Sequence, residues 1–310
     1  MSSGLSEQND ADMTRLLITE AVDPCYRQID RMSVGELALL MNEADSTVPG
    51  AVKLALPKIV PAIEAVAERM KSGGRLIYVG AGTPGRIAVV DASECPPTFS
   101  TPPERVLAII AGGPRAITFP CEGAEDDGVA GALAIDEAGV TALDSVIGIA
   151  SSGRTPYVVA AVRRARELGA LSIGISCNAG SVLGATAEHD IEVLVGAEVI
   201  SGSTRLKAGT AQKLVLNMFS TIVMVQLGKT YENLMVDLKP TNAKLRDRAA
   251  RIVSTVANVS REQAKNSLEL NDYNVKLAIL ILRLGISVEL AAARLDSVDG
   301  HLRAALGNAP

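Results

Sequence analysis

Five short apolar runs, most of them followed by a turn and a helical pattern, constrain the fold of this 310-residue chain most strongly. The runs are residues 76–79, 106–110, 146–150, 171–175 and 191–195, and the helical patterns cover residues 125–138, 156–168 and 204–226. Strands that alternate with helices form parallel βαβ units, whose right-handed crossovers cover both faces of a sheet. Unbroken apolar strands are typical of sheets buried on both faces. The pattern therefore predicts an α/β fold, a doubly wound three-layer sandwich around a five-stranded parallel sheet.

The segment before the first apolar run is polar at its start and helical afterwards. Residues 1–12 are expected to be disordered, and residues 13–44 to be helical with interruptions, including a capping box at Ser33 and Glu36. Residues 51–70 predict a helix that bends or restarts at its two prolines, Pro57 and Pro61, and that ends at residues 72–74.

The chain after Pro240 is helical throughout. The first predicted helix covers residues 242–259, and a capping box at Ser260 begins the second. The third covers residues 273–284 and stops at Gly285, and Ser287 caps a last helix. We therefore expect three parts: an N-terminal helical segment (1–50), an α/β ligand-binding domain (51–239) and a small all-helical module (240–310). The module would bind a partner or brace a dimer.

Composition excludes several classes of function. The formal charge is −5, aromatic residues make up 3% and tryptophan is absent, which argues against nucleic acid as a partner. The four cysteines are dispersed, without the spacing of a metal site. The N-terminus has no apolar segment of the signal-peptide type, and the longest apolar runs are too short or too polar to span a bilayer. We expect a cytoplasmic protein that binds neither membrane nor metal.

The first apolar run ends in a glycine-rich turn, Gly80 to Gly85. The turn matches the string of a dinucleotide site, which also needs an acid at the end of the next strand. Here the second run ends in residues 111–113, Ala-Gly-Gly, and Glu104 lies before that run. Pro84 suits the first turn of a following helix. The turn therefore favours a strand-to-helix anion site over NAD binding; the alternative is that the glycines only permit tight packing.

The third apolar run ends in a second turn of this kind, residues 151–156 with the sequence SSGRTP. Hydroxyl groups and free backbone N–H groups at a helix start form a phosphate site that the helix dipole assists. Ordinary N-capping by Ser152 or Thr155 is the alternative. Ligands of open α/β sheets bind at the carboxyl ends of the strands. If the two strands are neighbours, the two turns form one phosphate-binding site.

These residues resemble a known family. The two turns together resemble the sugar isomerase (SIS) domain, a phosphosugar-binding fold. Longer strings are similar to the N-acetylmuramic acid 6-phosphate etherase family: GAGTPGRIAVVDASECPPT, EGAED, GIASSGRTPYV, GISCN, GSTRLKAGTAQKLVLNM and, at residues 233–237, NLMVD. The likeness runs from about Ile18 to about Arg294 and covers most of the chain.

The resemblance implies a lyase that cleaves the C3 lactyl ether of N-acetylmuramic acid 6-phosphate to N-acetylglucosamine 6-phosphate and D-lactate. It implies a homodimer with sites near the subunit interface and no metal or nucleotide cofactor. Glu94 would be the general acid on the lactate oxygen and Glu125 the base at C2. The implied contacts to substrate and phosphate are Gly82, Thr83, Ser93, Ser151, Ser152, Gly153, Thr155, Glu198 and Lys207. Recycling of the cell's own wall and use of scavenged sugar both fit this activity.

The carboxylates also have interpretations that do not depend on the resemblance. An elimination needs one neutral and one ionised carboxyl group. Glu94 is expected in a loop stiffened by Pro96 and Pro97, where poor solvation would suit an acid. Glu122 and Glu125 lie near a predicted helix start, where acids are common as partners of the helix dipole. Only the resemblance selects Glu125.

A further charged cluster precedes the helical pattern at residues 204–226. Glu198, Arg205 and Lys207 would form either a surface ion pair or contacts with the sugar or the lactyl carboxylate.

The chain departs from the family's pattern at three places. Pro84 stands where the family more often has a serine, residues 99–101 are atypical, and residues 19–23 lack the usual glycine. None of these changes removes a carboxylate or a phosphate-binding hydroxyl.

Two other functions use the same phosphate site. A phosphosugar aldose–ketose isomerase would release no lactate. A sugar-phosphate-sensing regulatory protein would act through its C-terminal helices, but such proteins usually contain duplicated SIS units, and one is found here.

Overall fold

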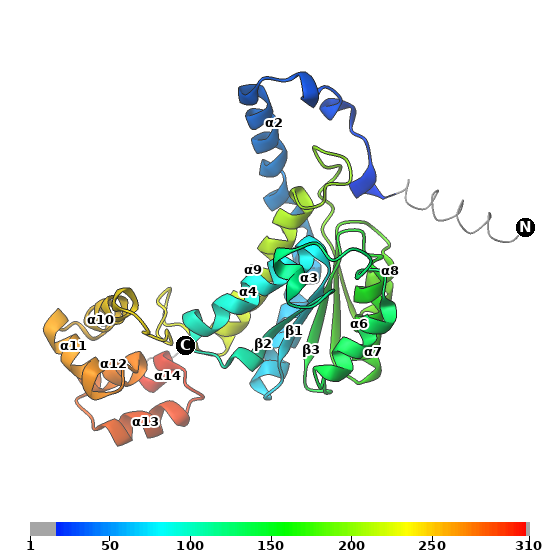
Figure 1. The fold of residues 1–310 in the computed structure, drawn as a ribbon. Coiled ribbons are helices and arrows are strands. Elements are labelled where there is room, and N and C mark those ends of the chain that lie inside the picture. The colour runs from blue at the N-terminus through cyan, green and yellow to red at the C-terminus, as the bar shows by residue number, and fades with distance from the viewer. Residues whose placement is uncertain (1–16, 308–310) are drawn as a thin grey trace, which may run out of the picture. The chain divides into compact units, whose positions relative to one another are not determined.

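A computed structural model of the chain describes residues 17–307 and contains the predicted parallel sheet (Figure 1). The strands are β1 (Leu76–Gly80), β2 (Val106–Ile110), β3 (Ser145–Ile149), β4 (Leu171–Ser176) and β5 (His189–Glu192), in the order β2-β1-β3-β4-β5. Every residue of β1, β3 and β4 is buried, as unbroken apolar runs predict. The disorder expected for residues 1–12 concerns residues outside the described range.

The last strand lies earlier in the chain than predicted. The apolar run predicts residues 191–195, but β5 pairs from His189, opposite Ile173, to Glu192, opposite Ser176. The hydrogen-bond register with β4 sets these bounds, and an edge strand tolerates polar residues such as His189 and Asp190 because it has one neighbour.

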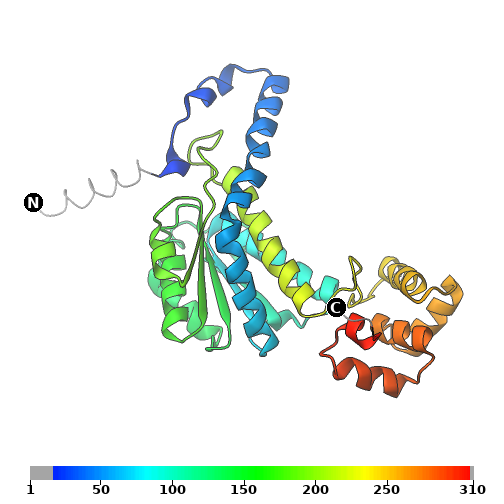
Figure 2. The same cartoon turned by 180° about the vertical axis from the view of Figure 1, so that it is seen from behind.

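Helices cover both faces of the sheet, which confirms the doubly wound fold (Figures 1 and 2). On one face α7 (Pro156–Glu167) packs on β1, β3 and β4, α6 (Gly128–Glu137) packs on α7, and α8 (Val182–Thr186) packs on β4 and β5. On the other face α3 (Val48–Lys71) packs on β4 and β5. The core between α7 and the sheet includes Ile77, Val146, Val158 and Val162.

Helix α3 is one continuous helix of 24 residues, so the predicted restart at its prolines is wrong. Pro57 and Pro61 are four residues apart and exposed. Their missing N–H groups therefore free only carbonyls on the solvent side, which water can satisfy. The opposite face buries Ile59 and Val66, among others, and this packing keeps the helix intact.

The N-terminal segment is helical with interruptions, as predicted, from Ile18 onward. Its elements are η1 (Ile18–Glu20), η2 (Pro24–Tyr26), η3 (Ile29–Arg31) and α2 (Val34–Ser46). The capping box at Ser33 and Glu36 is confirmed. The remaining elements around the sheet are α4 (Gly82–Phe99), η4 (Pro103–Arg105), α5 (Arg115–Thr118) and α9 (Lys207–Gln226). No helix within residues 17–307 is long and apolar enough to cross a membrane.

The chain divides into two compact units. The first holds the residues up to Ala92 together with Leu107–Phe219, and the second holds Ser93–Val106 and the residues from Ser220 on. The functional boundaries at 50/51 and 239/240 stay predictions.

The second unit contains the predicted small helical module. Its helices are α10 (Ala243–Ala257), α11 (Arg261–Leu270), α12 (Val275–Leu284), α13 (Val288–Asp296) and α14 (Leu302–Ala305). The capping box at Ser260, the left-handed stop at Gly285 and the cap at Ser287 are confirmed. Val253, Leu268 and Ile279 are fully buried in its core, so the module has a hydrophobic core of its own.

Candidate active site

The two glycine-containing turns leave neighbouring strands, as the phosphate-site prediction requires. In the parallel register Gly80 of β1 lies opposite Ile149 of β3, so both turns begin at the same edge of the sheet. The chain runs outward from β1 to β2 and then returns to the other side of β1 with β3. This reversal of strand order is where open α/β sheets bind their ligands.

The first turn is compact because its outer glycines touch. A Cβ atom on Gly80 would lie 2.6 Å from the nitrogen of Gly85, and one on Gly85 would lie 2.6 Å from Cγ1 of Ile110. Gly82 differs, because nothing lies within 4 Å of a Cβ atom at this position. What favours glycine here is its φ of +57°, which other residues rarely adopt. Helix α4 begins at Gly82, so Pro84 lies in its first turn as predicted. The tight-packing interpretation holds for Gly80 and Gly85, and Gly82 leaves open space beside the helix start.

In the second turn, the hydroxyl groups of Ser152 and Thr155 do not cap helix α7. Thr155 is the N-cap residue of α7, but its side chain makes no capping hydrogen bond. Ser152 Oγ accepts a hydrogen bond from Arg154 N at 3.2 Å, within the turn itself. Ser151 is buried, and Gly153 follows it with its N–H bonded to Ala150 O. The capping alternative is therefore wrong for both residues, and the hydroxyls suit an anion at the start of α7.

Gln212, which the sequence analysis did not single out, positions Ser151. Gln212 Nε2 donates a hydrogen bond to Ser151 Oγ at 2.9 Å. Gln212 is buried on α9, and its Oε1 finds no hydrogen-bond partner among residues 17–307. A buried amide oxygen without a donor costs about 1–3 kcal/mol. The arrangement suits a ligand that supplies a donor to Oε1 beside the Ser151 turn.

Asn178 ties the N-terminal segment to the same turn. Its Nδ2 donates to Ser151 O at 2.9 Å and to Thr19 Oγ1 at 3.0 Å, and its Oδ1 accepts from Ile18 N at 2.7 Å. Thr19 is fully buried by this contact. Residues 18 and 19 therefore brace the turn from a distant part of the chain.

Cys177, next to this asparagine, is unsuited to nucleophilic chemistry. Burial raises the pKa of its thiol to about 12, and the negative charge of Glu198 adds to the effect. The thiolate, which is the nucleophilic form, is therefore scarce at neutral pH.

Glu198 has a structural task that the sequence analysis missed. Its two carboxylate oxygens accept the N–H groups of Lys207 and Ala208, each at 2.9 Å, at the start of α9. Glu198 is only 1% exposed, and Arg205 is exposed. The predicted surface ion pair is therefore wrong, because a carboxylate at a helix start satisfies backbone donors and complements the dipole.

Lys207 is the buried cation of this region. Its residue is 5% exposed, and no carboxylate within residues 17–307 forms a salt bridge with it. A cation on a largely buried side chain is less well solvated than one on the surface, and an opposite charge nearby stabilises it. An anionic ligand would supply the missing charge.

Glu125 faces a cavity that it shares with the first turn. The cavity has a volume of about 220 Å³, and its lining includes Gly82, Arg86, Glu122 and Glu125. Glu125 is exposed and lies in a turn ahead of α6 rather than at its first residue. Its carbonyl oxygen accepts the N–H of Tyr157 at 3.0 Å, which holds it beside the second turn. Glu122 lines the same cavity, so the geometry leaves both acids as candidates.

Glu94 lies on a helix and not in the predicted proline-stiffened loop. Helix α4 continues through Pro96 and Pro97 to Phe99, and Glu94 is exposed. The helix persists because Cys95 and Phe99 stay buried on its other face. The expectation of poor solvation in this chain is therefore wrong.

Another missed residue anchors α4 one turn earlier. Asp91 is buried and accepts hydrogen bonds from Tyr78 Oη at 2.8 Å and from Asn217 Nδ2 at 2.6 Å. These bonds tie α4 to β1 and α9. A buried acid in an apolar helical pattern was the signal that could have identified it.

The structure thus gathers most predicted site residues in the first unit. The two turns, Glu125, Glu198 and Lys207 belong to that unit, whereas Ser93 and Glu94 belong to the second.

Known protein families match the chain in three segments. Residues 58–166 match the glucokinase regulatory protein N-terminal SIS domain, residues 129–222 match the SIS domain, and residues 232–279 match the C-terminal lid domain of glucokinase regulatory protein.

Curated relatives match almost the whole chain. N-acetylmuramic acid 6-phosphate etherase of Streptomyces avermitilis is 54% identical over 294 residues, covering 95% of this chain and 94% of that protein. The enzyme of the same name from Rubrobacter xylanophilus is 54% identical over 291 residues, covering 94% and 96%. Among solved structures, a phosphoheptose isomerase from Francisella tularensis is 20% identical with a TM-score of 0.46, covering 63% of this chain and all of that one.

Proposed function

Since this chain belongs to the N-acetylmuramic acid 6-phosphate etherase family, we propose that Glu94 and Glu125 carry the acid–base chemistry of its reaction. The protein is a carbon–oxygen lyase. It cleaves the C3 lactyl ether of N-acetylmuramic acid 6-phosphate, giving N-acetylglucosamine 6-phosphate and D-lactate. The observation that carries the proposal is the edge of the sheet where both anion-type turns meet and Glu125 opens into the cavity beside Gly82.

The reaction needs two proton transfers at different atoms. In the open-chain sugar the C1 aldehyde acidifies the hydrogen at C2, and Glu125 removes that proton. The C3–oxygen bond then breaks as Glu94 gives a proton to the departing lactate oxygen. Water adds to C3 of the resulting double bond, and a proton returns to C2. Each proton transfer by a positioned carboxyl group contributes roughly 10²–10⁴-fold to the rate.

The 6-phosphate is bound at the two turns. Ser151, Ser152 and Thr155 supply hydroxyl groups at the start of α7, where the helix dipole favours an anion. Gly82 and Gly153 in the turns, the hydroxyls of Thr83 and Ser93, and the side chain of Lys207 complete the set, and Glu198 holds the start of α9.

The decisive experiment measures D-lactate release from N-acetylmuramic acid 6-phosphate, with the unphosphorylated sugar as the control substrate. We expect lactate from the phosphorylated sugar alone, with activity lost in Glu94→Gln and Glu125→Gln. Glu122→Gln is the matched control, because Glu122 lines the same cavity as Glu125. Full activity in Glu125→Gln with loss in Glu122→Gln would overturn the assignment of the base. An absence of lactate would favour an isomerase or a sensor.

We also propose a cytoplasmic homodimer with its sites near the subunit interface, acting in recycling or scavenging of cell-wall amino sugar. The exposed position of Glu94 on α4 supports a site completed by another subunit. Mixed Glu94→Gln and Glu125→Gln proteins should then regain activity after subunit exchange. Light scattering that finds a monomer under active conditions would contradict this proposal.

A further inference from the structure

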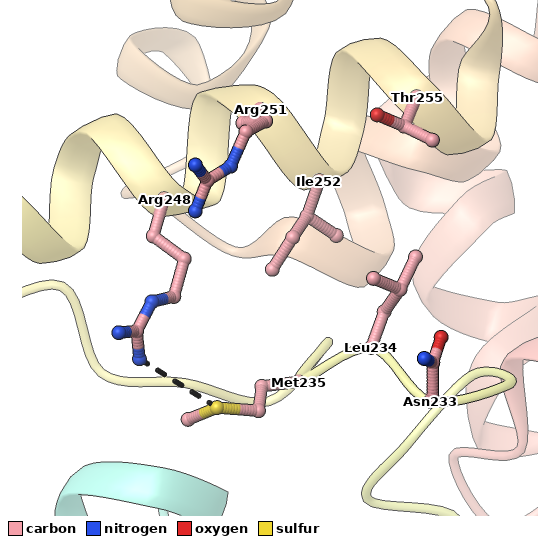
Figure 3. A pocket seen from close by; sticks show the side chains of 7 residues that line it. All are labelled: Asn233, Leu234, Met235, Arg248, Arg251, Ile252 and Thr255. Carbon is pink, nitrogen blue, oxygen red and sulfur yellow. Dashed lines mark hydrogen bonds between the residues drawn. The ribbon is translucent and has the colours of Figure 1, made fainter.

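A second pocket lies in the second compact unit, and none of the residues that line it is assigned to the reaction. It has a volume of about 280 Å³ and is lined by Asn233, Leu234, Met235, Arg248, Arg251, Ile252 and Thr255 (Figure 3). Three of these residues come from the string NLMVD at 233–237, to which the reaction assigns no role. The pocket therefore accounts for a motif that the known activity leaves unexplained.

One wall of the pocket is a single face of α10. Arg248, Arg251, Ile252 and Thr255 are spaced i, i+3, i+4 and i+7, so their side chains share one side of the helix. Figure 3 shows Arg248 reaching the facing segment at Met235 and Arg251 lying closer to the helix, with Ile252 between Arg251 and Thr255.

The opposite wall is the segment 231–237, which is held in place at both ends. Tyr231 and Leu234 exchange two backbone hydrogen bonds, at 3.1 and 2.9 Å. At the far end Asp237 forms salt bridges with Lys229 at 3.2 Å and Lys276 at 2.7 Å. Both ends of the segment are therefore fixed, and Asn233, Leu234 and Met235 between them face the helix (Figure 3).

The two arginines lack acidic partners, although carboxylates are close in sequence. Arg248 is half-buried and its one hydrogen bond goes to the thioether sulfur of Met235, at 3.7 Å, which is a weak acceptor. Within residues 17–307 no salt bridge involves Arg248 or Arg251.

Each acid on the two walls and at their edges is paired with another cation. Asp247 of α10 pairs with Arg261, Asp237 pairs with its two lysines, and Glu232 lies 3.9 Å from Arg303. The positive charge of the pocket is therefore not balanced from within the module.

We propose that this pocket binds a small organic anion through an oxyanion group held by Arg248 and Arg251. The guanidinium fork matches a phosphate or carboxylate group in two-point hydrogen bonding. Leu234, Ile252 and Met235 supply an apolar middle, and Asn233 and Thr255 supply neutral polar groups at the other end (Figure 3). The volume suits a ligand of about the size of a monosaccharide.

The test follows the methyl group of Met235 by NMR in the full chain labelled at its methionine methyls, with the Met235 signal identified by its loss in Met235→Leu. The probes are inorganic phosphate, N-acetylglucosamine 6-phosphate and D-lactate, each against sodium chloride at equal ionic strength. We expect a saturable shift of the Met235 signal. A shift with the phosphates alone identifies a phosphate site, and one with lactate alone identifies a carboxylate site.

The variants separate binding by the arginines from general effects of charge. Arg251→Ala and Arg248→Ala should each weaken the apparent affinity about tenfold or more. Arg251→Lys should restore part of it. Lys265→Ala is the matched control, since Lys265 is an exposed cation of the same module outside the pocket and should leave the affinity unchanged. Because Arg251 is exposed, its variants test the proposal even if Arg248→Ala fails to fold.

A last variant separates this pocket from the phosphate site of the reaction. In the double variant Ser151→Ala/Thr155→Ala the Met235 shift should persist. The proposal is overturned if the shift disappears there, if sodium chloride alone produces it, if none of the three anions produces it, or if the arginine variants bind as the parent does.

Discussion

Gln212 sets the direction of one hydroxyl group at the proposed phosphate site. Because its Nε2 donates to Ser151 Oγ, the hydrogen of that hydroxyl points elsewhere and is available to a ligand. The partnerless Oε1 can accept a second bond from substrate.

We predict that Gln212→Ala raises KM for the phosphorylated substrate about tenfold, the value of one buried hydrogen bond, with a smaller change in kcat. Steady-state kinetics measure both parameters. The effect should be non-additive with Ser151→Ala, because the two side chains act as one unit. A lowered melting temperature with an unchanged KM would show that Gln212 only fills space.

The sequence indicates residues whose role depends only on the turn that contains them. It does not indicate residues whose role depends on hydrogen-bond partners far away in the chain. The position of the hydroxyls of 151–155 between a strand and a helix could be predicted from the local pattern, and their binding of an anion stays a prediction. Gln212 and Asn178 could not, since their partner Ser151 lies 61 and 27 residues away. Pro96 and Pro97 predict a loop around Glu94, but burial of Cys95 and Phe99 on the other face keeps α4 helical there.

At the scale of elements, the start of α9 depends on Glu198. The carboxylate satisfies two backbone N–H groups that the helix itself leaves unbonded. Since α9 carries both Lys207 and Gln212, a displaced helix start would move two residues of the site.

We predict that Glu198→Ala destabilises the protein by about 2–4 kcal/mol, because two buried N–H groups lose charge-assisted bonds, and that Glu198→Gln costs less. Urea unfolding gives the difference. Arg205→Ala is the control, because that side chain is exposed nearby. If Glu198→Gln instead raised KM without loss of stability, a direct contact with the substrate would be indicated.

The bounds of an element can be predicted well where all of its residues are buried. They are predicted less well where hydrogen bonds with a neighbouring element set the bounds. The strands β1, β3 and β4 are fully buried apolar runs, and their bounds differ little from the prediction. The bounds of β5 follow its register with β4, which the sequence pattern does not encode. The continuity of α3 through its prolines likewise depends on which side faces the sheet.

At the scale of the whole molecule, a buried ion pair links the amino ends of β1 and β3, opposite the site. Asp144 accepts hydrogen bonds from Arg75 Nη2 at 2.7 Å, Arg75 N at 2.8 Å and Thr141 N at 2.9 Å. Burial by itself would raise the pKa of Asp144, but the bonds from Arg75 and Thr141 outweigh it and lower the pKa. The pair therefore contributes stability above the ordinary aspartate pKa of about 4, and this contribution is lost as pH falls through the lowered value.

We predict that Asp144→Asn lowers the free energy of unfolding by about 2–3 kcal/mol at pH 7. The difference from the parent should shrink as the pH falls from about 4, where Asp144 of the unfolded chain becomes protonated, toward the lowered pKa of the folded protein. Urea unfolding across this range measures it. Asp136→Asn is the control, since its pair with Arg164 is largely exposed and should change stability little. A difference independent of pH would contradict the assignment.

The contact between Gly80 and Gly85 also bears on which heritable changes this gene can tolerate. A Cβ atom at either position would lie 2.6 Å from backbone or from Ile110, far inside van der Waals contact, so selection should leave no alternative there. Gly82 has open space and only its positive φ to maintain, which asparagine and aspartate can adopt. In a library of all single variants selected for growth on the substrate, we expect only glycine at 80 and 85, and asparagine or aspartate surviving at 82.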